Sequence, residues 1–140
     1  MATGPVVITG GLVLASGTSH AAAADLLLHD DSIAAIHAQK VLRCLGVEQH
    51  FPQVFDITFT HFIPKPNPEP YNQVLKHLCL DGRECMMIED LPANLQPAKE
   101  LGMTTVLVGE IPGGIDGFVD YEIQDILKLS KVLQMLRVDL

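Results

Sequence analysis

The sequence predicts an α/β fold in three layers, with a mainly parallel sheet between helices and a β-hairpin segment at the N-terminal end. Residues 86–88 form a short apolar run without polar alternation, which is typical of a strand buried on both faces of a parallel sheet. A short helical pattern and the β-branched run of residues 104–108 follow, and together they make a β-α-β unit. The 140 residues, 48% of them hydrophobic, suffice for one domain with a core and are too few for two ordinary domains.

The N-terminal segment, residues 1–36, is predicted to form two hairpins. Residues 6–9 and 12–15 are expected strands joined by a double glycine, and residues 25–29 and 33–36 are expected strands around an Asp-Asp-Ser turn. The alanines and leucines of residues 21–28 are also good helix formers, so a helix remains open there.

The run VVITGGLVLASGTSHAAAADLLLHDDSIAAI resembles the opening β segment of amidohydrolase-superfamily enzymes. The resemblance implies that residues 1–36 have a different lineage from the rest of the chain. The metal ligands of that family do not follow, because no His-x-His appears after Ile36. The chain is also too short for a (β/α)8 barrel of about 250 residues, so amidohydrolase chemistry is not expected.

From residue 37 onward the pattern alternates between strands and helices. We expect a helical turn closed by Gly46, a strand from Phe51 to near Phe59, and a helix capped by Asn67 with Pro68 at its first position. A second helix begins near Pro92 and ends at Gly102. Residues 109–117 are expected to form a loop, residues 118–123 a last strand and residues 126–136 a terminal amphipathic helix. The apolar positions predicted to face the core in these helices are Val41, Leu42, Leu45, Tyr71, Val74, Leu75, Leu78, Leu91, Leu95 and Ala98.

The charge balance disfavours nucleic-acid and anionic-membrane partners. Nine Lys and Arg against 17 Asp and Glu give a formal net charge of −8, which repels phosphates. No apolar run reaches the ~20 residues of a membrane span, and the N-terminus lacks the basic region of a signal peptide. The three cysteines, Cys44, Cys79 and Cys85, have no paired spacing and are expected to be reduced core residues. We therefore expect a cytoplasmic protein.

Charged residues gather at two predicted loops of one sheet edge. Glu89 and Asp90 follow the buried strand, where the carboxyl edge of an open α/β sheet binds ligands. Lys65 lies in a proline-punctuated loop just before a helix. Carboxylate oxygens can hold Mg²⁺ while a lysine neutralises phosphate, so the pattern suggests a magnesium-dependent phosphoryl site. The alternative is an ordinary solvated charged edge.

Three linked stretches sharpen this reading: HAQKVLRCLGVEQHFPQVFDI, KPNPEPYNQVL and MIEDLPANLQPAKELGMTTVLVG. They resemble the C-terminal part of haloacid dehalogenase-like (HAD) hydrolases, particularly pyrimidine 5′-nucleotidase-like phosphatases. The resemblance covers residues 37–140 and implies a HAD-like, Rossmannoid core. It assigns Lys65 to the nucleophile and to phosphate binding, and Asp90 to Mg²⁺ with Glu89 as a supporting acid or second ligand. It assigns Asn94 to phosphate binding and to orientation of the loop. One compact domain would then contain both residues 1–36 and the core.

The family's first motif, a strand ending in Asp-x-Asp, is missing from the sequence, as is the cap segment that follows it. The first aspartate of that motif attacks phosphorus in the family. Asp30, after the apolar residues 26–29, could be a surrogate if those residues formed a strand beside residues 86–88; a polar hairpin turn is the simpler interpretation. The resemblance implies a second-motif Ser or Thr shortly before His37, a position that falls on Ser32 or on Asp31, which is not a hydroxyl residue; Thr9 is a weaker candidate.

These observations lead to three functional expectations. The leading one is a HAD phosphatase-derived domain that keeps a Mg²⁺ and phosphate edge with little or no phosphomonoester hydrolysis, acting on a phosphate-containing small molecule. The second is a non-catalytic, chimeric module that forms homo-oligomers, because an incomplete HAD core would expose apolar surface. The third is an active phosphohydrolase that uses Asp30.

Overall fold

The computed structural model describes residues 6–9, 12–15, 42–51, 53–55, 57–109 and 117–136. Its described strands form one six-stranded sheet in the order β3-β2-β1-β4-β5-β6. Neighbouring strands are parallel from β1 through β4 and β5 to β6, whereas β2 is antiparallel to both of its neighbours, β1 and β3. The strands are β1 (Val6–Thr9), β2 (Leu12–Ala15), β3 (Gln53–Val54), β4 (Cys85–Glu89), β5 (Thr104–Val108) and β6 (Tyr121–Ile123).

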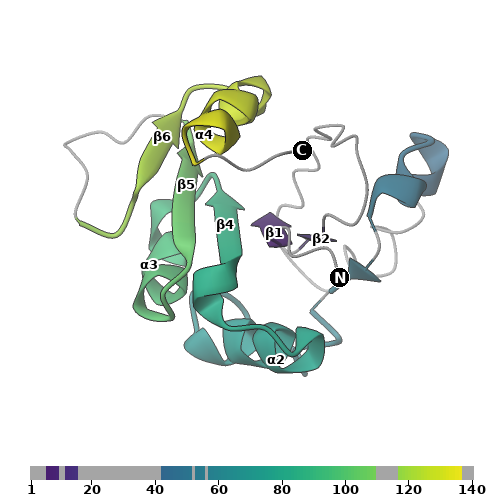
Figure 1. The fold of residues 1–140 in the computed structure, drawn as a ribbon. Coiled ribbons are helices and arrows are strands. Elements are labelled where there is room, and N and C mark those ends of the chain that lie inside the picture. Colours follow the sequence, from purple (N-terminus) through teal and green to yellow (C-terminus); the bar gives the residue numbers. More distant parts are fainter. Residues whose placement is uncertain are drawn as a thin grey trace.

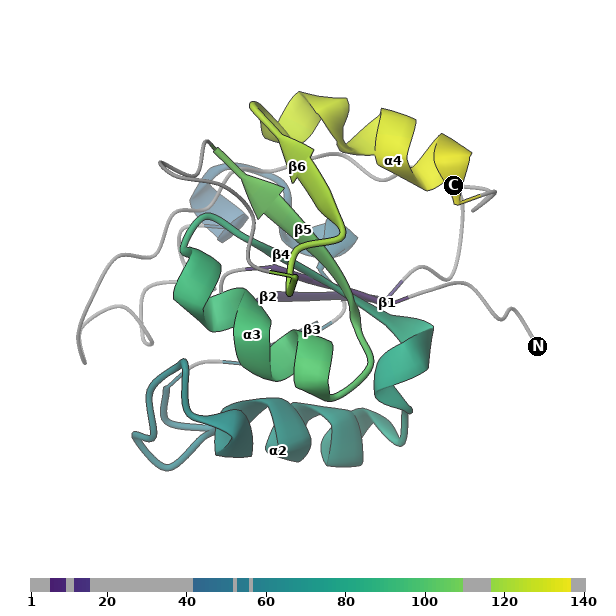
Figure 2. The same cartoon turned by 90° about the vertical axis from the view of Figure 1, so that its left-hand side faces the viewer.

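Helices cover both faces of the parallel part of the sheet (Figures 1 and 2). Helices α2 (Pro68–Leu78) and α3 (Pro92–Glu100) lie on one side, and α4 (Leu129–Met135) lies on the other. Three short 3-10 helices, η1 (Glu48–His50), η2 (Gly82–Glu84) and η3 (Ile126–Lys128), connect these elements. The predicted three-layer α/β fold is therefore confirmed.

Strand β4 is the centre of the core, and all five of its residues are buried. Cys85 and Met87 belong to a cluster with residues of α2 and α3, whereas Met86 and Ile88 belong to a cluster with residues of α4. This division follows from the two-residue period of a strand, which sends successive side chains to opposite faces. It explains why the sequence of β4 shows no polar alternation.

The sequence signals for α2 and α3 are confirmed. The Asn67 side chain accepts a hydrogen bond from the backbone N–H of Glu69 at 2.9 Å, and Pro68 and Pro92 open the two helices. Gly102, which follows α3, has a φ of +85°, a left-handed conformation that glycine adopts without steric cost. Leu91 precedes α3 and is 51% exposed, so its predicted core position is wrong. Leu45 is also exposed.

Two predicted strands are shorter than expected. The strand predicted from Phe51 to near Phe59 is reduced to the two residues of β3, because residues 57–62 turn instead. Phe62 N–H donates to the carbonyl of Ile57 at 2.8 Å, and Phe62 has a positive φ, so extended geometry is impossible there. The last strand starts only at Tyr121, and the terminal helix opens with the 3-10 helix η3.

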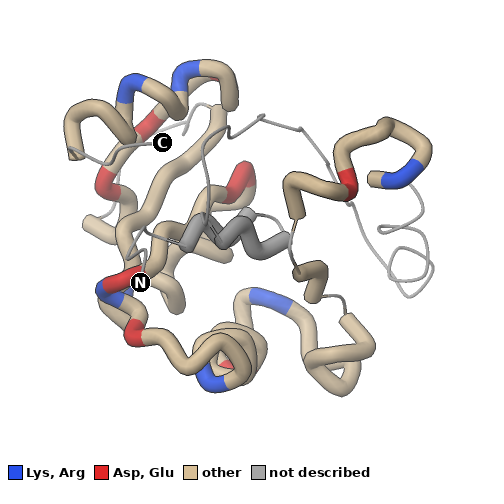
Figure 3. Tube along the Cα trace, turned by 45° about the vertical axis from the view of Figure 1, so that its right-hand side comes forward, with Lys and Arg blue, Asp and Glu red and all other residues tan. Residues whose placement is uncertain are grey.

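The predicted burial of the cysteines is correct for Cys85 alone. Cys85 lies in β4 and is buried, whereas Cys44 and Cys79 are exposed. Cys79 follows α2 with a φ of +54°, which places it past the apolar face of the helix. Figure 3 shows that lysines and arginines are interspersed with acidic residues along the described chain and form no continuous basic stripe.

The first predicted hairpin is confirmed as β1 and β2, with Val6 opposite Ala15 and Thr9 opposite Leu12. Strand β1 also pairs with β4 in parallel, so Val6–Thr9 occupies the position beside residues 86–88 that the sequence left open for residues 26–29. The second predicted hairpin, residues 25–36, lies outside the described residues.

Candidate functional site

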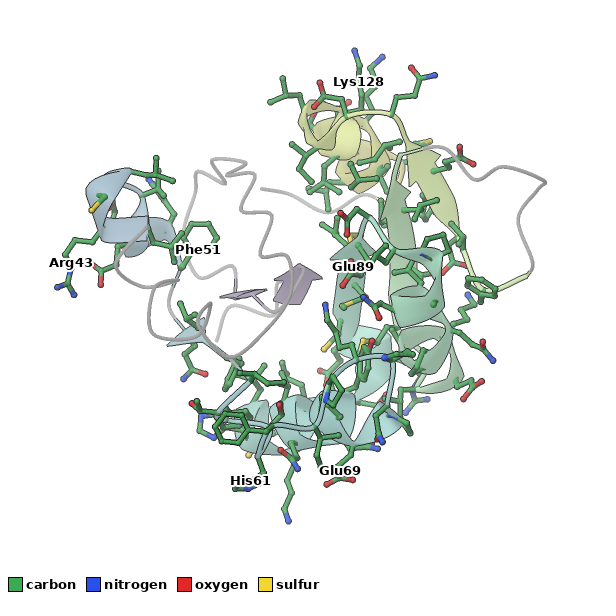
Figure 4. All side chains as sticks on the ribbon, turned by 180° about the vertical axis from the view of Figure 1, so that it is seen from behind. Arg43, Phe51, His61, Glu69, Glu89 and Lys128 are labelled. Atoms are coloured by element: carbon green, nitrogen blue, oxygen red, sulfur yellow. The ribbon has the colours of Figure 1, made fainter. Side chains whose placement is uncertain are left out.

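Glu89 ends β4 at the carboxyl edge of the sheet and is only 4% exposed. Its position in the strand alternation matches that of Cys85 and Met87, so it faces the layer of α2 and α3. Figure 4 shows Glu89 within the fold, whereas Glu69 on α2 points away from it. A carboxylate buried this deeply must be paired to remain charged.

Lys65 supplies that partner from the loop before α2. Its Nζ forms an ion pair with Oε1 of Glu89. The Lys65 side chain is 25% exposed and the Glu89 side chain 3%, so the cation lies between the buried carboxylate and solvent. The structure thus brings together the lysine and the acidic loop that the sequence placed at one edge.

Asn94 approaches Glu89 from the first turn of α3. Its Nδ2 donates to Glu89 Oε1 at 3.0 Å, and its own side chain is buried. Asn94 therefore contacts the same carboxylate oxygen as Lys65. The sequence prediction that Asn94 helps to orient this loop agrees with that contact, whereas its assigned contact with phosphate remains a prediction.

The other carboxylate oxygen of Glu89 holds the loop that follows β4. Glu89 Oε2 accepts hydrogen bonds from the backbone N–H of Asp90 at 3.0 Å and of Leu91 at 3.4 Å. With two donors on each oxygen, the carboxylate uses about four acceptor sites, which is its full capacity. Burial acts to raise the pKa of Glu89, but the charge of Lys65 and these hydrogen bonds outweigh it and lower the pKa.

Asp90 differs from its neighbour because its side chain is exposed. Partial burial, followed by hydrogen bonding to Glu89 and the negative charge of Glu89, raises the pKa of Asp90. Binding of a cation would stabilise the ionised form of a carboxyl group that lies beside a second carboxylate. Of the two adjacent carboxylates, Asp90 is the one that is exposed enough to bind a cation.

The donors at this edge fit Mg²⁺ in one limited respect. Mg²⁺ is usually bound through one or two carboxylates, with several waters and substrate phosphates completing its octahedral shell. Asp90 offers one such carboxylate, and Glu89 offers none without losing a hydrogen bond. Within the described residues no group of three or more His, Cys, Asp or Glu side chains is arranged to hold a metal ion.

The remaining predicted site residues fall outside this geometry. Asp30, Asp31 and Ser32 lie outside the described residues. Thr9, the weaker hydroxyl candidate, ends β1 in register with Ile88, which puts its backbone at the carboxyl edge beside Glu89. The side chain of Thr9 is not described.

Two residues, Tyr71 and Asp120, make polar contacts that the sequence does not predict. Tyr71 was predicted only as an apolar face residue of α2, yet its hydroxyl donates to the backbone carbonyl of Asn94 at 2.7 Å. A tyrosine at a buried helix position is the available signal, because its hydroxyl needs a partner. Asp120, beyond the predicted site, accepts hydrogen bonds from the backbone N–H and the hydroxyl of Thr105 and pairs with Lys99.

Comparison with known proteins gives a family match. The sequence model of the family described as haloacid dehalogenase-like hydrolase matches residues 11–102, which is more than half of the chain. The match includes residues 11–36, the segment that is predicted to have a different lineage.

Among curated proteins, the bifunctional epoxide hydrolases 2 of Mus musculus and Rattus norvegicus are each 36% identical over 62 residues. The match covers 44% of this chain and 11% of each relative, so the chain spans a small part of these proteins.

Three solved structures share the fold at 24% identity. They are a HAD phosphatase from Thermococcus onnurineus (TM-score 0.59, 69% of this chain and 45% of that chain), a 2-haloacid dehalogenase from Pseudomonas syringae pv. Tomato DC3000 (0.58, 68% and 42%) and a β-phosphoglucomutase from Clostridium difficile (0.59, 71% and 44%). The chain therefore spans less than half of each of these proteins. Among the helices of the described residues, none is long and apolar enough to cross a membrane.

Proposed function

Because this chain belongs to the haloacid dehalogenase-like hydrolase family, we propose that the carboxyl end of β4 is a Mg²⁺- and phosphate-binding edge. The observation that carries the proposal is the convergence of Lys65 and Asn94 on the buried Glu89, directly beside the exposed Asp90. Lys65 binds phosphate oxygens and Asp90 binds Mg²⁺. The preferred ligand is a phosphate-containing small molecule.

The roles of the three charged residues follow from their contacts. A lysine ammonium carries three N–H donors, and Lys65 directs one of them to Glu89, so two remain for a phosphate at the partly exposed side. Glu89 has no acceptor capacity left and serves to fix Lys65 and the Asp90 loop, which favours the supporting role over metal ligation. When bound at Asp90, Mg²⁺ would supply charge neutralisation and polarisation of a phosphoryl oxygen.

We propose that phosphomonoester hydrolysis is weak or absent. The sequence contains no Asp-x-Asp, the motif whose first aspartate attacks phosphorus in the resembling family. Without a nucleophile, a lysine and a metal ligand can bind phosphate but cannot form a covalent phosphoenzyme. The resemblance to pyrimidine 5′-nucleotidase-like phosphatases implies a specificity for pyrimidine 5′-nucleotides. The proposal is that the chain binds such nucleotides without hydrolysing them.

Binding and turnover should be measured separately. Isothermal titration calorimetry of inorganic phosphate in the presence of Mg²⁺ should show binding to the wild-type chain, weaker binding for Lys65→Met, and loss of the Mg²⁺ dependence for Asp90→Asn. Glu122→Gln is the matched control, because Glu122 is an exposed carboxylate on β6 with no part in the site. If both site variants bound phosphate with wild-type affinity and wild-type Mg²⁺ dependence, the carboxyl end of β4 would be excluded as the binding site.

Turnover of pyrimidine nucleoside monophosphates distinguishes the proposal from the active alternative. We expect release of inorganic phosphate at the rate of the buffer control. Robust hydrolysis abolished by both Asp30→Asn and Asp90→Asn would show instead that Asp30 serves as a nucleophile. Hydrolysis abolished by Asp90→Asn alone would place the nucleophile elsewhere in the chain.

Self-association is the second candidate. Leu127 of η3 and Met135 of α4, at 68% and 65% exposure, are two large exposed apolar side chains in the segment that follows β6. We propose that the chain forms homo-oligomers through this region. Light scattering at micromolar concentration should report a mass above that of one chain, and Leu127→Ser combined with Met135→Ser should reduce it. A monomeric wild-type mass would refute this candidate.

A further inference from the structure

Tyr71 of α2 is hydrogen-bonded to Asn94 of α3, a residue of the candidate site. Tyr71 is 4% exposed, and its hydroxyl donates to the Asn94 carbonyl at 2.7 Å. Asn94 in turn uses its side chain to hold Glu89 at 3.0 Å. One residue of α3 thus receives a hydrogen bond from α2 through its backbone and gives one to β4 through its side chain.

These contacts close a ring that contains the lysine. Lys65 pairs with Glu89, Glu89 accepts from Asn94, Asn94 accepts from Tyr71, and residues 65–71 connect Tyr71 back to Lys65 through the chain itself. Because Pro68 starts α2 between the two ends, the segment from Lys65 to Tyr71 runs from a loop into a regular helix. The position of Tyr71 in α2 therefore limits where Lys65 can lie.

The chemistry of Tyr71 suits a fixed donor. Burial, and secondly the negative charge of Glu89, raise the pKa of the Tyr71 hydroxyl, so it remains protonated at any physiological pH. The Asn94 carbonyl has two lone pairs and can accept this bond in addition to a helical one. A phenylalanine in the same place would fill nearly the same volume but leave the carbonyl without this donor.

We propose that Tyr71 is a positioning residue for the Lys65–Glu89 pair, acting through Asn94. This inference rests on the proposed phosphate-binding function for its effect on affinity, but the link from Tyr71 to Asn94 and Glu89 can be tested without any ligand. The competing explanation is that Tyr71 only satisfies its own hydroxyl and stabilises the packing of α2 on α3.

The ligand-free test is an NMR measurement on Tyr71→Phe. Tyr121→Phe is the matched control, because these are the two tyrosines of the chain and Tyr121 lies on β6, away from the site. We expect the Asn94 side-chain amide signals, assigned by their loss in Asn94→Ala, to shift in Tyr71→Phe and to stay in place in Tyr121→Phe. Unmoved Asn94 amide signals in Tyr71→Phe would overturn the proposal, even if the melting temperature falls.

The affinity test uses inorganic phosphate with Mg²⁺. Loss of one positioning hydrogen bond should weaken phosphate binding about threefold to tenfold in Tyr71→Phe. Tyr71→Phe made in the Asn94→Ala background should weaken phosphate binding no further, because Asn94→Ala has already removed the hydrogen bond to Glu89 through which Tyr71 acts. An equal additional loss in that background would show that Tyr71 does not act through Asn94. Absence of phosphate binding by the wild-type chain would refute the proposed function and leave the NMR test of the ring decisive.

A second measurement covers the case in which Tyr71→Phe does not fold. Wild-type chain labelled with 3-fluorotyrosine gives two fluorine signals, one from each tyrosine. Lys65→Met breaks the ring at its far end, and the Tyr71 signal should then move while the Tyr121 signal does not. If neither signal moves, or both move equally, Tyr71 and Lys65 are not coupled and the proposal is wrong.

Discussion

Replacement of Glu89 by glutamine tests the arrangement of the site most directly. The carboxylate accepts four hydrogen bonds, two on each oxygen, and glutamine replaces one oxygen with a donor. Whichever way the amide turns, two donors lose their acceptor: either those of Lys65 and Asn94 or the backbone N–H groups of Asp90 and Leu91. Each buried donor left unpaired costs about 1–3 kcal/mol.

The expected loss is about 3 kcal/mol, toward the lower end of that sum, because Lys65 is 25% exposed and can turn to water. For a domain of this length, such a loss lowers the melting temperature by roughly 10–15 °C. Urea unfolding at pH 7 measures the free energy of unfolding, with Glu122→Gln on the exposed face of β6 expected to stay within about 0.5 kcal/mol of wild type.

A double-mutant cycle separates the ion pair from the loop contacts. Lys65→Met keeps the apolar stem of the side chain and removes the charge, which leaves the buried Glu89 without a cation. The sum of the two single losses of unfolding free energy should exceed the loss in the double variant, because the double variant has no uncompensated buried charge. If Glu89→Gln costs less than 1 kcal/mol, or if the two losses simply add, the buried pair does not organise this edge.

Three further results are expected. The stability contributed by Glu89 should be fully present above its ordinary pKa of 4.5 and should fall as the pH drops through the lowered folded-state pKa, so the acid limb of a stability–pH curve should be flatter in Glu89→Gln; an unchanged limb would contradict this. Asp90 has the opposite sign, because its pKa is raised in the folded state, so Asp90→Asn should melt at a slightly higher temperature at pH 7, and a clear loss of stability would contradict the reasoning. Asp120→Ala should lower the free energy of unfolding by about 1–3 kcal/mol, because it removes the acceptor of the Thr105 bonds, yet leave phosphate affinity unchanged, because Thr105 lies near the amino end of β5; weaker phosphate binding would contradict this separation.

The features that the sequence predicted correctly are those encoded over a few neighbouring residues. The buried strand β4, the Asn67 cap, the proline starts of α2 and α3 and the left-handed Gly102 each depend on local geometry. The proximity of Lys65 and Glu89 could also be predicted from the sequence, because a loop before a helix and a loop after a parallel strand can lie at the same edge of a sheet.

The errors arise where particular side-chain hydrogen bonds, some local and some distant, override the apolar pattern. Residues 57–62 have aromatic and β-branched side chains typical of a strand. The hydroxyl of Thr60, however, lies within hydrogen-bond distance of the carbonyls of Ile57 and Ile63, which stabilises a turn. The bond from Tyr71 to Asn94 joins residues 23 positions apart, and an apolar periodicity contains no information about which carbonyl a buried hydroxyl will meet.

The position of β1 changes the structural basis of the hypothesis that Asp30 is a surrogate nucleophile. That hypothesis placed residues 26–29 as a strand beside β4, but β4 pairs with β1 along Val6–Thr9 on one side and with β5 on the other. No additional strand can join β4 over the same residues, because both of its hydrogen-bonding edges are in use. The hypothesis for Asp30 therefore loses the strand beside β4 on which it rested. The hydrolysis assay on Asp30→Asn tests the role of this residue without that strand, and the strand that ends at this edge beside β4 has Thr9 as its last residue and no aspartate.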